Sequence, residues 1–567
     1  MGMSDRWYEN AIIYCLDVDT FQDSDGDGDG DFAGLTKRLD YLAGLGVTCI
    51  WLLPFYPSPN RDNGYDVTEY YGVDPRLGTL GDFVEFMREA RERGMRVIVD
   101  LVVNHTSDQH PWFQAACRDK RSPFRDFYVW SEEKPADAHE GVVFPGKQDA
   151  VWTYSEEAGA YYFHRFYEHQ PDLNINNPAV RAEIFKIMGF WAELGVSGFR
   201  VDAAPFLIEL KGIDDPEIDD PYLYLKEMHE FLTARRGDAI LLAEANVSPD
   251  KIAAYFGDGD KMHMLFNFLV NQPLFLALAR EQAAPLIKAL DALPEIPTWG
   301  QWANFLRNHD ELDLGRLSDA ERGEVFKQFG PEEHMQLYER GIRRRLAPML
   351  GGDQARLALA YSLLFTLPGT PVLRYGEEIG MGDDLSLEER ESVRTPMQWS
   401  PEENGGFSKA PRKKLVRPVI SGGSYGYQRV NVAAQSRDPR SLLNTIERMI
   451  RTRKVCPEFG WGQAQIMDTG EASVFAHRCE WDGGIVLAVH NLSSKACPVT
   501  LDLSEYEAGH LVDLLGDREY RRFDGGKHQI ELEGYGYRWF RVDDIRQASQ
   551  ESERMEARKQ GNKGTRE

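Results

Sequence analysis

Short apolar runs alternate with longer amphipathic stretches over the first 450 residues or so of the chain. Eight of the runs are rich in β-branched and aromatic residues, which is typical of strands. They span 11–21, 47–55, 96–105, 198–204, 240–246, 263–271, 304–311 and 370–378. Near-continuous apolar strands are typical of parallel sheets buried on both faces. The stretches between them, such as 77–93 and 178–194, have helical periodicity.

Eight strand–helix units of this kind predict an α/β fold, a (β/α)8 TIM barrel. A doubly wound open sheet is the alternative, but no GxGxxG segment follows the first predicted strand. Residues 106–177, after the third strand, are polar and aromatic and predict an inserted subdomain. The barrel is then expected to comprise residues 1–105 and 178–453.

The pattern changes after a helix predicted near 441–453. Short alternating strands separated by glycine turns predict a C-terminal antiparallel β-sandwich domain over 454–545. Its strands are expected at 473–476, 485–490, 498–503, 529–532 and 535–542. Residues 546–567 are charged and nearly free of large apolar side chains, so we expect a disordered tail.

The net charge narrows the range of partners. The 567 residues include 65 Lys and Arg against 91 Asp and Glu, a formal charge of −26. This acidity argues against nucleic acid and anionic membranes as partners, because both require clustered cations. No apolar run approaches the ~20 residues that span a bilayer, and the N-terminus lacks the pattern of a signal peptide. Six scattered cysteines without CxxC spacing favour a reducing cytoplasm, and self-association into homo-oligomers is left open.

Polar residues gather at the carboxyl ends of four predicted strands, where TIM barrels hold their catalytic groups. They are Asp100, Asn104, His105, Arg200, Asp202, Glu244, Asn246, Asn308, His309 and Asp310. Any one of them alone would be interpreted as a cap or turn residue. Burial of a carboxylate costs free energy, so several carboxylates on one rim indicate a catalytic site instead.

Cleavage of a glycosidic bond suits this set of residues. It needs one ionised carboxylate and one protonated carboxyl, and a third carboxylate raises the pKa of the acid by repulsion. Arg200, two residues before Asp202 on the same strand face, is expected to keep Asp202 ionised. His105 and His309 are expected to donate to sugar hydroxyls.

Five segments resemble the signature regions of the α-amylase superfamily, glycoside hydrolase family 13, and occur in the order of that family. They are DLVVNH (100–105), QPDLN (170–174), GFRVD (198–202), LLAEAN (241–246) and NHD (308–310). The resemblance covers roughly residues 7–545. It implies Asp202 as nucleophile, Glu244 as general acid/base and Asp310 as the carboxylate that stabilises the transition state. It also implies net retention at an α-linkage.

The resemblance also implies residues that bind the substrate. Asp62 and Tyr65 in DNGYD occupy positions that line the glucose pocket of exo-acting members, and Arg394 in RTPMQW resembles an arginine that pairs with that aspartate. Tyr65 offers a stacking face, and Asp62 with Arg394 offers recognition of hydroxyl groups.

Longer stretches, among them WLLPFYPSP, FLRNHDEL and LPGTPVLRYGEEIGMGDD, are most similar to the family members that isomerise maltose to trehalose. This similarity implies an intramolecular glucosyl transfer on a small α-glucoside, with hydrolysis as a minor reaction. An α-glucosidase or general α-glucosyltransferase with the same catalytic residues is the alternative. A non-catalytic scaffold is disfavoured, because all three carboxylates are present.

Two cation sites are expected, both structural. Residues 23–31, DSDGDGDGD, place carboxylates at alternate positions, a spacing of hard oxygen ligands that suits Ca²⁺. A similar loop in α-glucosidase-like members binds Ca²⁺ or Mg²⁺, which implies side chains of Asp23, Asp25, Asp27 and Asp31 and the carbonyl of Asp29 as ligands. The resemblance implies a second Ca²⁺ on Asn104, Asp172 and Glu209 with the carbonyls of Phe206 and Leu207.

Overall fold

Eight parallel strands close into a barrel in this computed structural model, which describes residues 6–209, 220–506, 509–516, 518, 520 and 522–544. The strand order is β1-β14-β10-β9-β8-β7-β3-β2. The strands are β1 (Ile13–Leu16), β2 (Cys49–Leu52), β3 (Arg96–Leu101), β7 (Gly198–Val201), β8 (Ile240–Ala243), β9 (Met264–Phe266), β10 (Gln301–Phe305) and β14 (Thr370–Arg374). The TIM barrel is therefore confirmed, and the expected helices are α3 (Leu80–Glu92) and α5 (Pro178–Glu193).

Alternate strand residues fill the barrel interior. Cys15, Trp51, Leu242 and Val372 belong to one buried apolar cluster, whereas their strand neighbours face the surrounding helices. Each strand is shorter than its apolar run, because the run continues into the loop that follows the strand.

The sixth and seventh apolar runs do not match their strands throughout. β9 stops at Phe266, because the side chain of Asn267 accepts the Val270 N–H and starts α9 (Phe268–Arg280). The expected strand over 263–271 is therefore wrong beyond Phe266. β10 begins at Gln301 and ends at Phe305, so the NHD segment lies in the following loop.

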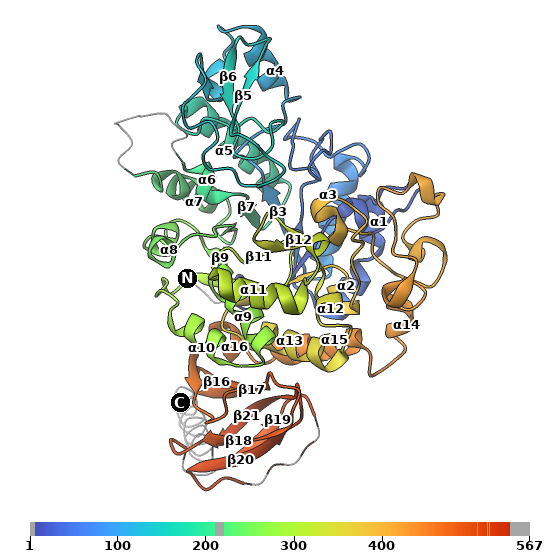
Figure 1. Ribbon diagram of the computed structural model, residues 1–567, viewed down its shortest axis with the longest axis vertical. Helices are drawn as coiled ribbons and strands as arrows, with labels where there is room; N and C mark the ends of the chain where they lie inside the picture. The colour runs from blue at the N-terminus through green and yellow to red at the C-terminus, as the bar shows by residue number, and fades with distance from the viewer. Residues whose placement is uncertain are drawn as a thin grey trace, which may run out of the picture.

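Two insertions follow barrel strands at their carboxyl ends. Between β3 and β7, helix α4 (Pro111–Arg118) precedes a sheet of order β4-β6-β5 (Trp130–Ser131, Ala160–Phe163 and Trp152–Ser155). After β10, a small sheet β11-β13-β12 (Leu312–Asp313, Gly341–Ile342 and Gln336–Leu337) accompanies helix α11 (Asp319–Phe329). In Figure 1 the first insertion lies at one end of the molecule and the C-terminal strands at the other.

The C-terminal strands form two antiparallel sheets, as expected for this part of the chain. One has the order β15-β16-β17-β21-β19 and the other pairs β18 with β20. They are β15 (Gln463–Met467), β16 (Val474–Trp481), β17 (Gly484–Asn491), β18 (Cys497–Asp502), β19 (Gly509–Asp513), β20 (Lys527–Leu532) and β21 (Tyr537–Asp544). β15 and β19 were not among the predicted strands. Leu487, Leu501 and Phe540 share the apolar core between the sheets.

Hydrogen bonds join this domain to the barrel. The indole of Trp539 donates to Ser362 Oγ of α13 (Gln354–Thr366) at 2.8 Å, and a ring nitrogen of His490 lies 2.9 Å from the same oxygen. The tail expected to be disordered, 546–567, lies outside the described residues.

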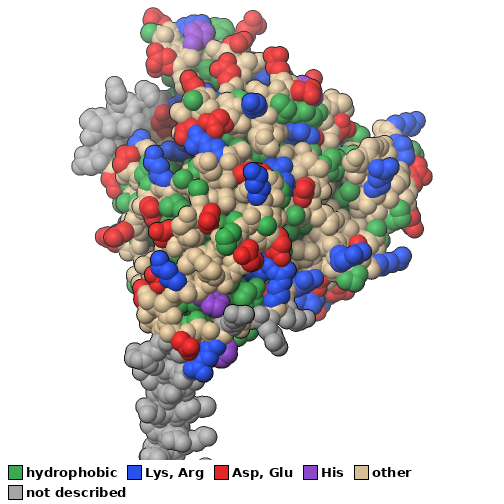
Figure 2. All heavy atoms as spheres, turned by 60° about the horizontal axis from the view of Figure 1, so that its bottom comes forward, with side chains coloured by type: hydrophobic (Ala, Val, Ile, Leu, Met, Phe, Trp, Pro, Cys, Tyr) green, Lys and Arg blue, Asp and Glu red, His purple; other side chains and the backbone are tan. Residues whose placement is uncertain are grey.

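The described helices include none that is long and apolar enough to cross a membrane. On the face shown in Figure 2, Lys and Arg side chains are interspersed with Asp and Glu side chains.

Candidate active site

A cavity of about 400 Å³ opens at the carboxyl ends of the barrel strands, a volume suited to a small ligand. Seven of the nine residues expected to act on or bind the substrate line it: Asp62, Tyr65, His105, Asp202, Glu244, His309 and Asp310. The other two, Arg200 and Arg394, lie behind the wall and hold its carboxylates. The structure thus brings together side chains from loops after five different strands.

Arg200 is the centre of the charge network beneath the cavity. Its side chain is 2% exposed and donates from Nη1 to Asp202 Oδ1 at 2.6 Å and from Nη2 to Glu244 Oε2 at 2.7 Å. It also pairs with Asp100, a fully buried residue of β3. Three carboxyl groups therefore share a single guanidinium.

This arrangement affects protonation. Burial raises the pKa of Asp202 and that of Glu244 to about 7, and the Arg200 charge opposes the rise in both. Burial also raises the pKa of Asp100 to about 6. Because one cation cannot neutralise three carboxylates, the pair formed by Asp202 and Glu244 retains a proton near neutral pH.

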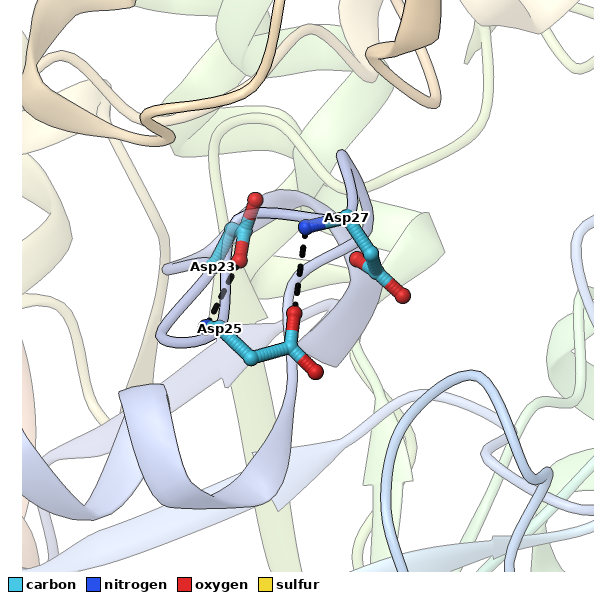
Figure 3. Close-up of side chains that lie close together, drawn as sticks. All are labelled: Asp23, Asp25 and Asp27. Atoms are coloured by element: carbon cyan, nitrogen blue, oxygen red, sulfur yellow. Dashed lines mark hydrogen bonds between the residues drawn. The ribbon is translucent and has the colours of Figure 1, made fainter.

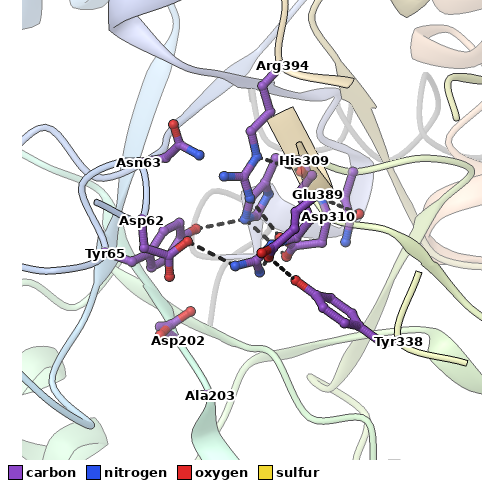
Figure 4. A network of polar contacts seen from close by, with 12 residues as sticks. Asp62, Asn63, Tyr65, Asp202, Ala203, His309, Asp310, Tyr338, Glu389 and Arg394 are labelled. Atoms are coloured by element: carbon purple, nitrogen blue, oxygen red, sulfur yellow. Dashed lines mark hydrogen bonds and ion pairs between the residues drawn. The ribbon is translucent and has the colours of Figure 1, made fainter. Parts of the chain in front are cut away.

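Asp310 is in the opposite situation, because two arginines bind it. Arg390 and Arg394 both donate to its Oδ1 at 2.9 Å, and Figure 4 shows Arg394 beside Asp310. Burial lowers the pKa of the adjacent His309 far below its usual value, so that imidazole is neutral and the arginines supply the charge. Although burial opposes the change, these neighbours hold the pKa of Asp310 well below its ordinary range.

The expected pairing of Arg394 with Asp62 is wrong. Arg390 Nη2 donates to Asp62 Oδ1 at 2.9 Å, whereas Arg394 bonds Asp310 and the carbonyl of His309. Arg390 thus bridges two carboxylates of the cavity wall. In the sequence, Arg390 stands out only as a basic residue four positions before Arg394 in an acidic segment. That pattern is also typical of a solvent-exposed turn, so it does not indicate this contact.

Tyr65 and the two histidines form one side of the cavity. The Tyr65 ring lies parallel to the His309 ring at 5.6 Å, and its hydroxyl is 2.8 Å from His309 Nε2. His105 Nε2 lies 3.0 Å from the Tyr65 carbonyl. Directly after Asp202, Ala203 has a φ of 49°, a costly value for a residue with a Cβ, and its N–H donates to Glu244 Oε2.

Apart from Asn246, which the sequence placed on the catalytic rim, the outer wall was not predicted. Four phenylalanines line it, Phe144, Phe166, Phe206 and Phe268, together with the polar residues Asn246, Glu311, Asp313, Arg340 and Arg390. Asn246 ends the LLAEAN segment, Glu311 directly follows NHD, and Phe206 and Phe268 belong to α6 (Ala204–Leu207) and α9; the others come from the two insertions and from the loop that carries Arg390. Nothing in their local spacing marks them as members of a site.

A bridge over this wall connects the two insertions with the loop that carries Arg390. The hydroxyls of Tyr167 and Tyr338 both donate to Glu389 Oε2 at 2.6 Å, and Lys147 Nζ lies 3.3 Å from Glu389 Oε1. Phe144 packs between the two tyrosine rings, with centroids 4.8 and 4.7 Å away. Figure 4 shows Tyr338 and Glu389 beside the carboxylates of the cavity. We call Glu389, Tyr167, Tyr338 and Lys147 the Glu389 bridge.

The acidic loop 23–31 brings three of its five aspartates together. Single carboxylate oxygens of Asp23, Asp25 and Asp27 lie within 4.8 Å of one another (Figure 3). Asp31 is not in this cluster. Its carboxylate accepts the N–H groups of Ser24 and Gly34 and so caps helix α1 (Phe32–Lys37), while Asp29 lies 3.6 Å from Arg76. A set of three hard oxygen ligands fits Ca²⁺ or Mg²⁺.

The residues expected to bind a second cation are only partly gathered. Asn104 Nδ2 donates to Asp172 Oδ2 at 3.1 Å. Glu209 pairs with the guanidinium of Arg165 at 2.6 Å, and the backbone N–H of Arg165 donates to Asp172 Oδ1. The carbonyls of Phe206 and Leu207 belong to the short helix α6 (Ala204–Leu207). An arginine thus already neutralises one of the proposed ligands, and this site stays a prediction.

Comparison with known proteins agrees with this geometry. Residues 15–328 and 336–462 match the model of the α-amylase catalytic domain, and residues 483–541 match that of the C-terminal domain of sucrose hydrolase-like proteins. A trehalose synthase of Pimelobacter sp. (strain R48) is 42% identical over 557 residues, which cover 96% of this chain and 97% of that protein.

Solved structures give the same result. An α-amylase from H. orenii superposes with a TM-score of 0.77 at 29% identity, covering 94% of this chain and 99% of the other. The trehalulose synthase MutB of Pseudomonas mesoacidophila MX-45 superposes with a TM-score of 0.74 at 27% identity, covering 95% and 99%. The chain therefore belongs to the α-amylase family, glycoside hydrolase family 13.

Proposed function

We propose that this chain is a retaining glucosyl-transferring isomerase that interconverts maltose and trehalose, with hydrolysis as a minor reaction. The observation that carries the proposal is the shared guanidinium of Arg200, which holds the carboxyl groups of Asp202 and Glu244 on its two terminal nitrogens. A shared guanidinium keeps the two carboxyl groups close together, which supports the ~5–5.5 Å separation of a retaining mechanism over the ~6.5–9.5 Å of an inverting one. The resemblance to trehalose synthases supports the choice of substrate.

In the first step Asp202 attacks the anomeric carbon of the non-reducing glucose. The bond from that carbon to the bridging oxygen breaks, and the oxygen takes the proton of Glu244. Asp310, kept ionised by Arg390 and Arg394, stabilises the positive charge that develops on the sugar ring. The products of this step are a covalent glucosyl ester of Asp202 and a free glucose.

In the second step the released glucose attacks the ester through its own anomeric hydroxyl, and Glu244 takes back the proton. Two inversions give net retention and an α,α-linked disaccharide. Because water competes for the ester, the glucose must remain beside it at a high effective concentration. The aromatic outer wall and the Glu389 bridge favour this retention and so favour isomerisation over hydrolysis.

The direct test is to incubate the purified full chain with maltose and, separately, with trehalose, and to separate the sugars by chromatography over time. We expect each disaccharide to yield the other, with glucose as a minor product. Glucose as the dominant product from maltose, or a growing series of oligosaccharides, would instead establish an α-glucosidase or a general glucosyltransferase.

Replacing Glu389 by Ala is expected to raise the share of glucose among the products several-fold, because the departing glucose escapes and water replaces it. The measurement is the ratio of glucose to trehalose at low conversion of maltose. Glu388→Ala is the matched control, because Glu388 is the exposed neighbour of Glu389 and lies outside the bridge. An unchanged ratio in Glu389→Ala would show that the bridge does not retain glucose.

We further propose that Asp23, Asp25 and Asp27 bind a structural Ca²⁺ or Mg²⁺. The buried Asp23 already accepts N–H groups of Gly26 and Gly28, so a bound cation would fix the loop between β1 and α1. The cation would neutralise the mutual repulsion of the three carboxylates. Its role would be in stability, because none of the three lines the active-site cavity.

Chelation is therefore expected to lower the melting temperature of the parent chain by about 2 °C or more, since binding of a ligand at 100 times its Kd stabilises by about 2.7 kcal/mol. In Asp27→Asn the chelator should have no effect. Asp137→Asn, which removes an exposed charge elsewhere, should behave like the parent. Equal melting temperatures of the parent with and without chelator would contradict the loop site.

A cytoplasmic location remains part of the proposal. It is supported by the cysteines, all six of which lie within the described residues and are free thiols, as a reducing compartment would keep them.

A further inference from the structure

A second cavity, of about 470 Å³, lies at the other end of the barrel, where the strands begin. Its walls come from three separate parts of the chain: the segment before β1, the loop before β10, and helix α16 (Glu458–Trp461) with β15 and the end of β16. We call it the amino-end cavity and define it by Arg6, Glu9, Thr298, Trp461, Gln463 and Trp481. The proposed reaction uses none of these residues.

Two tryptophans form the aromatic part of its lining. The rings of Trp461 and Trp481 meet at an angle of 63° with centroids 4.8 Å apart, and both side chains are partly exposed. The indole nitrogen of Trp461 is buried and has no hydrogen-bond partner among the described residues. Because protein atoms cover this nitrogen, the part of the two side chains that is open to a ligand is their ring surface.

The polar part of the lining contains an ion pair, formed by Arg6 and Glu9. Arg6 pairs with the buried carboxylate of Glu9, and its Nη2 also donates to the Thr298 carbonyl at 2.8 Å. Burial raises the pKa of Glu9 to about 7, and the Arg6 side chain already donates to Glu9 and to the Thr298 carbonyl, so little of its charge is left to attract an anion. The exposed amide of Gln463 and the carbonyls of the loop before β10 add further donors and acceptors.

Two partly exposed aromatic side chains beside a set of donors and acceptors suit a neutral ligand with many hydroxyl groups and an apolar ring face. We propose that the amino-end cavity is a second saccharide site, which binds short α-glucosides away from the catalytic carboxylates. The choice of an α-glucoside over other saccharides rests on the proposed function. A saccharide bound there would stay attached to the protein, but the cavity would take no part in bond cleavage.

The test is isothermal titration of the full chain carrying Asp202→Ala, which prevents turnover, with maltose. Two binding events are expected. Adding Trp481→Ala should remove one event or weaken it at least tenfold, and Trp481→Phe should weaken it less, because a ring remains. Trp299→Ala is the matched control: this exposed tryptophan lies next to Thr298 but does not line the cavity. Melting temperatures will show that each variant folds.

A single binding event, or a second event that persists in Trp481→Ala, would overturn the proposal. In the otherwise unaltered chain, Trp481→Ala should leave the isomerisation rate at saturating maltose unchanged. This separates the two proposals: loss of the second event leaves the isomerase assignment intact, and failure to isomerise leaves the Trp481-dependent event intact.

Discussion

Replacing Asp202 by Ala is expected to reduce turnover of maltose by about 10⁴-fold or more, as removal of the nucleophile does in other enzymes that form covalent intermediates. Without this carboxylate no glucosyl ester forms, because the methyl group of Ala cannot attack the anomeric carbon. The measurement is the initial rate of trehalose formation, with glucose followed in parallel. A variant that retains a tenth of the parent rate would exclude Asp202 as the nucleophile.

Loss of folding has to be separated from loss of chemistry, and Asp202→Asn does this. Burial raises the pKa of Asp202 from 3.8 to about 7 in the folded chain, so the folded state favours the protonated form. The stability that the protonated form contributes is fully present below 3.8, the pKa of Asp202 in the unfolded chain, and is lost as the pH rises through 7. Above that pH the ionised carboxylate destabilises the fold. Asn removes this charge.

The melting temperature of Asp202→Asn is therefore expected to exceed that of the parent at pH 8, with a smaller difference at pH 5.5. The activity of this variant should be as low as that of Asp202→Ala. A variant that is inactive yet more stable at high pH carries a chemical defect. A lower melting temperature at pH 8 would show instead that the Asp202–Arg200 ion pair outweighs the cost of burial.

The barrel and the catalytic rim could be predicted from the sequence, because four of the predicted strands are directly followed by their own polar residues. Asp202 follows Val201, the last residue of β7, and Glu244 follows Ala243, the last residue of β8. Parallel strands in a closed barrel place such termini on one edge, so position along the chain determines position in the site.

Other features depend on contacts that local patterns do not contain. Arg390 rather than Arg394 binds Asp62, and two cations four residues apart in a loop give no indication of which will reach a given carboxylate. Asp31 caps a helix and does not belong to the aspartate cluster. The repeated Asp residues of this loop look alike in the sequence, so their different contacts could not be predicted from it. The Glu389 bridge joins side chains more than 200 residues apart.

Replacing Glu244 by Gln should lower the turnover of maltose by about 10³-fold or more, because no proton reaches the bridging oxygen. The amide keeps the size of the carboxyl group and can still accept a hydrogen bond from Arg200 Nη2. The effect should depend on the leaving group. α-Glucosyl fluoride releases fluoride without needing a proton, so the variant should still form the glucosyl ester of Asp202 from it.

The pH profile provides the second part of this test. Burial raises the pKa of Glu244 to about 7, so kcat/KM of the parent for maltose is expected to fall as the pH rises through that region and the acid loses its proton. With α-glucosyl fluoride, the Gln variant should lack this alkaline limb. Because the ester in the variant has no base to activate the attacking glucose, added azide, which needs none, should accelerate its release as α-glucosyl azide. If the Gln variant turns over maltose near the parent rate and keeps the alkaline limb, the proton donor is a group other than Glu244.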